Sequence, residues 1–200
     1  QMKVINALVE GIMDESVAIR IIKTTGHIPG AVYGKRGCGY IKDKIRGFNQ
    51  AAQGACYLTM VDFMDTHLGC PPDVISSWLP HPNPSMMFRV VERELESWLL
   101  ADRGNMAKFL CVGVSKVPNN PEQIPDPKLT LVNLARKSRS KYIRSALVPA
   151  EGSTAQVGKL YVSEMINFIQ NHWDIQVARQ SARSLDKCLT RLGSLEKPNA

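Results

Sequence analysis

The chain has 200 residues, of which 44% are hydrophobic, and carries a formal net charge of +7 with a pI near 9.3. This length and hydrophobic content suffice for one large domain with a packed core, which excludes an intrinsically disordered chain. No stretch reaches the roughly 18 uncharged apolar residues of a membrane span, and the first 20 residues contain acids where a signal peptide is uncharged. We therefore expect a globular cytoplasmic protein that does not enter a membrane.

Five cysteines are spread along the chain, and no two of them form a C-x-x-C pair. An odd number at such wide spacing argues against a disulfide framework and against a zinc ribbon. A reducing compartment fits this pattern.

Strands and helices alternate along the first half of the chain. Short apolar runs rich in β-forming residues predict strands over 3–9, 56–63 and 86–91. Amphipathic spacing and a proline start predict helices over 14–24, 41–53 and 71–78. The glycine-rich stretch 26–39 predicts a loop with at most a short strand at 31–33.

Helical patterns dominate the second half of the chain. They cover 92–102, 129–146, 158–170 and 176–192, with a proline-rich loop over 113–127. Strands that alternate with helices indicate an α/β fold, in which a mostly parallel central sheet is covered by helices on both faces. We expect an α/β core over 1–112 and a helical C-terminal part over 113–200, packed together as one compact domain.

Two of the predicted strands end on a carboxylate. Glu10 follows the first strand, Asp62 closes the second, and Asp65 comes three residues later. Ligands of open parallel sheets bind beyond the carboxyl ends of the strands, so these acids are expected on one rim. Like charges repel in a partly desolvated cleft, and bound Mg²⁺ or Mn²⁺ relieves that repulsion. Each acid alone has a plainer explanation, Glu10 as a helix cap and Asp62 as the partner of a lysine; their coincidence favours the metal.

Basic residues concentrate in three segments, 35–46, 128–144 and 179–191, which hold 15 of the 25 lysines and arginines and only two acids. Each segment alone is typical of a solvated helix face, but the three together indicate a polyanionic partner. The candidates for binding a nucleic-acid backbone are Lys35, Arg36, Lys42, Lys44, Arg136, Lys137, Arg139, Lys141 and Lys187.

The stretch LVEGIMDE, followed by an aspartate pair at the end of a later strand, resembles the topoisomerase-primase (Toprim) domain. More narrowly, the ordered set ELESWLLAD, DPKLTL, GKLYVSEM and SLDKCL is similar to a Toprim-like family of unknown function that accompanies AAA/ABC-type ATPases in bacterial anti-phage loci. The resemblance spans nearly the whole chain. It implies a three-layer Toprim-like core with a helical C-terminal extension.

The resemblance also implies roles for individual residues. Glu10 would be a metal ligand or general acid/base, with Glu15 a second acid of the same element and Asp62 the first metal-binding aspartate. The family's Asp-x-Asp is here Asp62-Phe63-Met64-Asp65, so Asp65 can join the metal only if the chain turns after Phe63. Glu96 would be a further metal-site acid, with a salt bridge to Arg93 or Arg89 as the alternative. Lys128 would steady a phosphate, or else be a solvated lysine before a helix.

Three functions remain open from the sequence. The first is a Mg²⁺- or Mn²⁺-dependent nuclease acting on DNA or RNA, including tRNA, as the effector of a two-component defence system with an ATPase partner. The second is a non-catalytic Toprim-like subunit that binds nucleic acid or the ATPase without cutting. A phosphotransferase or primase-like enzyme would use the same acids.

Three other sites are weighed and rejected. GAVYGKR lacks the glycine spacing and the Ser/Thr of a P-loop, although its amides and Lys35 could still contact a phosphate. His67, Cys70 and His81 lack the paired spacing of a zinc site. The three tryptophans fall on apolar helix faces and are expected in the core rather than in base-stacking platforms.

Overall fold

The computed structural model describes residues 2–196 and divides into two compact units. The sheet unit comprises 2–92 and 184–196, and the helical unit comprises 93–183. This division differs from the predicted boundary after residue 112. Helix α4 (Leu95–Leu100) packs against α6 (Pro127–Arg136) and α9 (Ile175–Ala178), so the segment after the last strand joins the C-terminal helices.

Four parallel strands form the sheet, in the order β2-β1-β3-β4: β1 (Val4–Val9), β2 (Ile28–Gly34), β3 (Cys56–Asp62) and β4 (Met86–Val91). The α/β fold with a parallel sheet is therefore confirmed. The segment expected to be mostly loop, however, contains the seven-residue strand β2, which pairs with β1 from Ile28 to Gly34. Its half-exposed, glycine- and proline-containing sequence fits an edge strand, where pairing depends on the backbone and not on apolar side chains.

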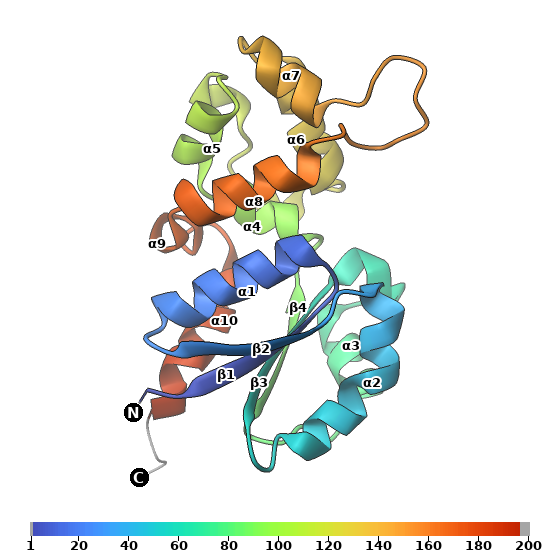
Figure 1. The fold of residues 1–200 in the computed structure, drawn as a ribbon, viewed down its shortest axis with the longest axis vertical. Coiled ribbons are helices and arrows are strands. Elements are labelled where there is room, and N and C mark those ends of the chain that lie inside the picture. Colours follow the sequence, from blue (N-terminus) through green and yellow to red (C-terminus); the bar gives the residue numbers. More distant parts are fainter. Residues whose placement is uncertain (1, 197–200) are drawn as a thin grey trace. The chain divides into compact units, whose positions relative to one another are not determined.

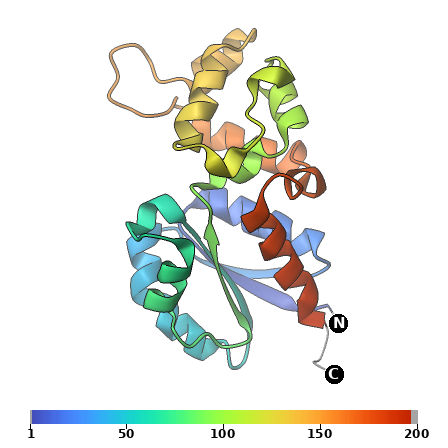
Figure 2. The same ribbon diagram turned by 180° about the vertical axis from the view of Figure 1, so that it is seen from behind.

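Helices cover both faces of the sheet, in three layers: α1 (Ile12–Thr24) and α10 (Arg183–Gly193) on one face, α2 (Gly37–Ala51) and α3 (Pro71–Trp78) on the other (Figure 1). Figure 2 shows α10 in front of the strands from the opposite side. The α1 face is buried through Val17, Ala18, Ile21 and Ile22, as its spacing predicted. On the other face, Ile41 and Ile45 of α2 join strand residues in one apolar cluster.

The helical unit also contains α5 (Arg103–Phe109), α7 (Lys141–Leu147) and α8 (Tyr161–Asn171). The single helices expected over 129–146 and 176–192 are each interrupted. The break after α6 lies in a serine-containing turn, where the Ser140 hydroxyl accepts the Ile143 N–H at 3.3 Å and begins α7. Serine side chains compete locally for backbone groups, and apolar periodicity does not reveal that competition.

The three tryptophans lie in the core, as predicted. Trp78 is 4% exposed, Trp98 is fully buried and Trp173 is 2% exposed. The Trp173 indole N–H donates to the Trp98 carbonyl at 3.2 Å, which satisfies its one polar group. Within residues 2–196, every helix falls short of the length and apolar character needed to cross a bilayer.

Helix α5 ends in a Schellman motif with an unusual residue at its left-handed position. Val112 N–H donates to Ala107 O at 3.0 Å and Cys111 N–H to Lys108 O at 3.1 Å. Cys111 has a φ of +54°, a conformation that favours glycine.

Cys111→Gly is therefore expected to raise the free energy of unfolding by about 0.5–1 kcal/mol, because it removes the strain of a side chain at positive φ. Urea denaturation of the variant beside Cys111→Ala measures the effect. The alanine variant removes the thiol but keeps the strain, so equal stability of the two variants would contradict this explanation.

Candidate functional site

The ends of β1 and β3 bring two of the predicted acids together. The strands are parallel neighbours, paired from Ile5 with Cys56 to Leu8 with Thr59, so their carboxyl ends lie at the same sheet edge. There the Asp62 backbone N–H donates to Glu10 Oε1 at 2.7 Å. Glu10 thus spans two strands and does not cap α1, whose N-cap residue is Gly11.

A tight turn brings Asp65 to the same place. The 3₁₀ turn η1 (Phe63–Thr66) begins directly after Asp62. The Asp65 carboxylate lies within hydrogen-bonding reach of the Glu10 carboxyl, and this contact raises the Glu10 pKa. The turn that the i, i+3 spacing required is therefore present, and Asp65 joins Glu10 although the two aspartates do not share a strand face.

The Glu10 carboxyl is in an environment that favours its protonated form. Burial raises its pKa to about 8, the charges of Asp14 and Asp65 raise it further, and the Asp62 N–H opposes them. Glu10 is therefore largely protonated at neutral pH, and it can donate the hydrogen bond that joins it to Asp65.

Asp14 is a member of this group that the sequence reasoning missed. It lies in the first turn of α1 and is 9% exposed. A Cβ on Gly11 would lie 3.3 Å from Asp14 Oδ2, so the glycine leaves room for the carboxylate. Glu15, the acid selected from the sequence, instead forms an ion pair with Lys35 at 3.1 Å. The available signal was the spacing E-G-x-x-D, which places Asp14 in the first turn of the helix that follows Glu10.

Cys38, in the first turn of α2, belongs electrostatically to the same group. Burial raises the pKa of its thiol to about 12, and the charges of Glu10, Asp65 and Asp62 add to this effect. The thiol therefore stays protonated at neutral pH, which makes Cys38 neither a nucleophile nor a soft metal ligand there.

The loop before α2 places basic groups next to these acids. Gly34, Lys35 and Gly37 all have positive φ. The Lys35 N–H donates to Val9 O at 2.8 Å and the Gly37 N–H to Glu10 O at 3.0 Å. The loop is thus fixed to the end of β1, next to Glu10, Asp14, Asp62 and Asp65, the group called the acidic edge below. The side chains of Lys35 and Arg36 on this loop are exposed.

The other predicted nucleic-acid contacts are surface residues in both units. Lys42 lies 5.9 Å from the Trp78 ring centre, and Lys44 and Lys187 are exposed. In the helical unit, four exposed cations form no ion pair with any described residue: Arg136, Lys137, Arg139 and Lys141.

The buried Glu96 and the one-third exposed Lys128 form a charged cluster in the helical unit. Glu96 is 2% exposed and accepts a hydrogen bond from the Tyr161 hydroxyl at 2.9 Å. Lys128 Nζ lies 3.8 Å from Glu96 Oε1 and 3.2 Å from Glu94 Oε1. Burial raises the Glu96 pKa while Lys128 lowers it. Among the described residues, the ion-pair partner of Glu96 is therefore Lys128, in place of the expected Arg93 or Arg89.

Two carboxylates at the acidic edge fit a hard divalent cation. Across residues 2–196, no group of three or more His, Cys, Asp or Glu side chains is arranged to hold a metal ion. Mg²⁺ commonly takes only one or two protein carboxylates and completes its shell with water and substrate phosphate oxygens. Glu10 and Asp65 supply such a pair, because a cation can replace the proton between them.

Comparisons with protein-family models, with curated proteins and with solved structures found no match to this chain. The function proposed next depends on its own residues and on the sequence resemblance.

Proposed function

We propose that this chain is a Toprim-type nuclease that uses Mg²⁺ or Mn²⁺ to cleave DNA or RNA phosphodiesters. The observation that carries the proposal is the meeting of Glu10, Asp62 and Asp65 at the carboxyl ends of two adjacent parallel strands. That edge is where open parallel sheets bind their ligands. A basic loop at the same edge adds the charge that a phosphate substrate needs.

Each group has a task in this proposal. Glu10 and Asp65 would hold the cation, and the Asp62 N–H fixes the orientation of the Glu10 carboxylate. When bound, the cation supplies water activation and neutralises charge on the scissile phosphate. Lys35 and Arg36, exposed on the loop before α2, would bind the phosphate backbone.

The sequence resemblance extends the proposal to partners. It supports a cytoplasmic effector of an anti-phage system that works with an AAA/ABC-type ATPase and acts on DNA or RNA, tRNA included. All of these targets contain phosphodiester bonds, and the acidic edge would recognise that group.

Glu10→Gln is expected to reduce metal-dependent cleavage about 100-fold or more, because the amide cannot replace the carboxylate as a metal ligand. Single-stranded and duplex DNA and RNA are incubated with wild type or variant in Mn²⁺, in Mg²⁺ or in EDTA, and products are resolved on denaturing gels. The ATPase partner is added in a parallel series, since the resemblance implies one.

Asp43→Asn is the matched control, because Asp43 is an exposed acid on α2 outside the acidic edge. It should cleave like wild type, and thermal melts should show both variants folded. Cleavage that persists in Glu10→Gln, or in EDTA, would refute the proposal.

The second candidate is a non-catalytic subunit that binds nucleic acid or the ATPase. It is favoured by the hydrogen bond between Glu10 and Asp65, which holds the acids together without a cation. Under this candidate no cleavage is seen with any substrate, and Glu10→Gln binds nucleic acid with wild-type affinity.

A further inference from the structure

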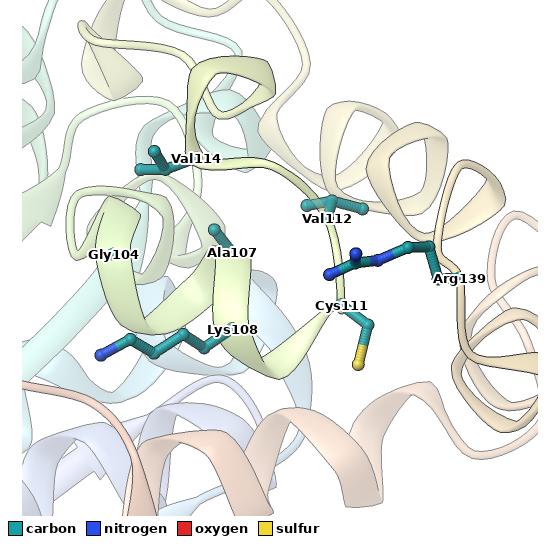
Figure 3. A pocket seen from close by; sticks show the side chains of 7 residues that line it. All are labelled: Gly104, Ala107, Lys108, Cys111, Val112, Val114 and Arg139. Atoms are coloured by element: carbon teal, nitrogen blue, oxygen red, sulfur yellow. The ribbon is translucent and has the colours of Figure 1, made fainter.

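A pocket of about 530 Å³ lies in the helical unit. Its lining is largely apolar and includes Ala107, Val112 and Val114 (Figure 3). Ala107 and Val112 are nearly buried, whereas Val114 is about half exposed. The volume lies within the range of pockets that hold small organic groups.

The two sides of the pocket are fixed to each other by the backbone. One side is the end of α5, closed by the Schellman motif at Cys111. The other is the segment between α6 and α7, whose Arg139 N–H donates to Cys111 O at 3.2 Å. The pocket is therefore a preformed feature of the unit and does not depend on a loose loop.

The charged side chains that line the pocket are both positive. Lys108 and Arg139 line the pocket, and no acid lines it. Figure 3 shows Lys108 on α5 and Arg139 on the segment between α6 and α7, with the Lys108 ammonium pointing away from Arg139. Neither forms an ion pair with any residue in the described part of the chain. An apolar lining flanked by two uncompensated cations is complementary to a ligand with an apolar body and an anionic group.

Three more uncompensated cations belong to the same segment as Arg139: Arg136, Lys137 and Lys141. One small anion would need only one or two of these charges. Five cations, four on this segment and Lys108 on α5, instead match a polymer with several phosphates.

We propose that this pocket takes one unpaired nucleotide of a nucleic-acid strand, its base over Ala107, Val112 and Val114, with one backbone phosphate at Arg139 and the next at Lys108. The inference deepens the proposed function, on which it rests, by assigning single-stranded nucleic acid as the polymer that the helical unit grips. A base can enter a pocket only when it is out of the duplex stack, so the site selects unpaired strands.

Gly104 makes the pocket testable without disturbing the fold. It lines the pocket in α5, and a Cβ added there meets no atom within 4 Å. Gly104→Phe should therefore fill the pocket, while Gly104→Ala adds only a methyl group and leaves it open. Both substitutions replace a helical glycine, so neither is expected to weaken α5.

Binding is measured on the full chain by fluorescence anisotropy, in EDTA so that no cleavage occurs, with a labelled oligothymidylate and a duplex of equal length. We expect the single strand to bind about 10-fold more tightly than the duplex, and Gly104→Phe to lose about 10-fold relative to Gly104→Ala. Arg139→Gln should lose more affinity than Lys159→Gln, which removes an exposed cation outside the pocket.

Three results would overturn the inference: equal affinity for duplex and single strand, equal binding by the two Gly104 variants, or equal loss from the Arg139 and Lys159 substitutions. Competition with thymidine monophosphate tests whether the pocket binds a nucleotide within a strand or a free nucleotide. A mononucleotide that binds as tightly as the strand would assign the pocket to free nucleotides instead.

Failure of the pocket can be told apart from failure of the nuclease. Binding in EDTA is measured without the metal ion, so it tests the pocket independently of cleavage, and the exposed-acid control Asp43→Asn should bind the strand like wild type. If the Gly104 and Arg139 variants bind the strand like their controls while metal-dependent cleavage is present, the pocket inference is wrong and the proposed nuclease function stands.

Discussion

Lys128→Met is expected to lower the free energy of unfolding by about 2–4 kcal/mol. The substitution keeps the length of the side chain but removes the ammonium that lies 3.2 Å from Glu94 and 3.8 Å from Glu96. Glu96 is 2% exposed, so water cannot replace the lost partner. The Lys128 side chain itself is one-third exposed (34%), which keeps the effect below that of a fully buried pair. Urea denaturation at neutral pH, followed by tryptophan fluorescence, measures the loss.

The double variant Lys128→Met/Glu96→Gln should recover part of this stability, because a neutral amide still accepts the Tyr161 hydroxyl. Lys137→Met is the matched control, since Lys137 is an exposed lysine just after the same helix, with no ion pair among the described residues. It should change stability by no more than about 0.5 kcal/mol. A Lys128→Met variant as stable as Lys137→Met would contradict the buried-pair explanation.

The pH dependence of that loss has a definite sign. Burial raises the Glu96 pKa, and removal of Lys128 takes away the charge that lowers it. A carboxyl with a raised folded-state pKa contributes stability that is present at low pH and is lost as the pH rises through that pKa. The deficit of Lys128→Met should therefore be smaller at pH 5 than at pH 8.

This cluster also changes the interpretation of Lys128. The sequence resemblance implies that its ammonium steadies a phosphate, yet in the structure that ammonium neutralises two carboxylates. A phosphate would have to compete with both. A catalytic role of Lys128 stays a prediction. The stability of Lys128→Met measures the energy of the ion pairs with Glu94 and Glu96 that the Lys128 ammonium would have to break to bind a phosphate.

The strands could be predicted wherever burial dictated the side chains. Residues 56–62 and 86–91 are apolar because both faces of β3 and β4 are covered, and their bounds were predicted to within a residue. The edge strand β2 was mostly missed, since it is held by backbone pairing to β1 and its side chains remain partly exposed. Propensity and periodicity carry little information at such a strand.

Only those residues of the acidic edge that lie directly at strand ends could be predicted from the sequence. Glu10 and Asp62 could be placed because a parallel sheet brings the carboxyl ends of its strands to one side. The contact of Asp65 with Glu10 depends on a 3₁₀ turn of four residues. The sequence places Asp14 in the first turn of the helix after Glu10, but its approach to Glu10, like that of Cys38, depends on how α1 and α2 leave the sheet, which local sequence does not encode.

Glu10 is expected to make the folded state less stable as the pH rises. Its pKa is about 8 when folded, against an ordinary value of 4.5. Below about pH 4.5 both states hold the proton, and the contribution of the neutral carboxyl is fully present. Between pH 4.5 and 8 the unfolded chain releases the proton while the folded chain keeps it, so stability falls. Above pH 8 both states are ionised and the curve levels.

Glu10→Gln removes this titration and keeps the hydrogen bonds, because an amide accepts the Asp62 N–H and can donate to Asp65. In EDTA, the stability of wild type relative to the variant should fall by about 2–4 kcal/mol from pH 5 to pH 9, somewhat below the limit set by the full pKa difference because Glu10 is partly exposed. Urea denaturation at several pH values measures it, with Asp43→Asn expected to follow wild type. Parallel curves for wild type and Glu10→Gln would show that Glu10 is ionised in the folded protein. If the proposed cation site is correct, Mn²⁺ should reverse the loss at high pH in wild type only, because a cation displaces the same proton.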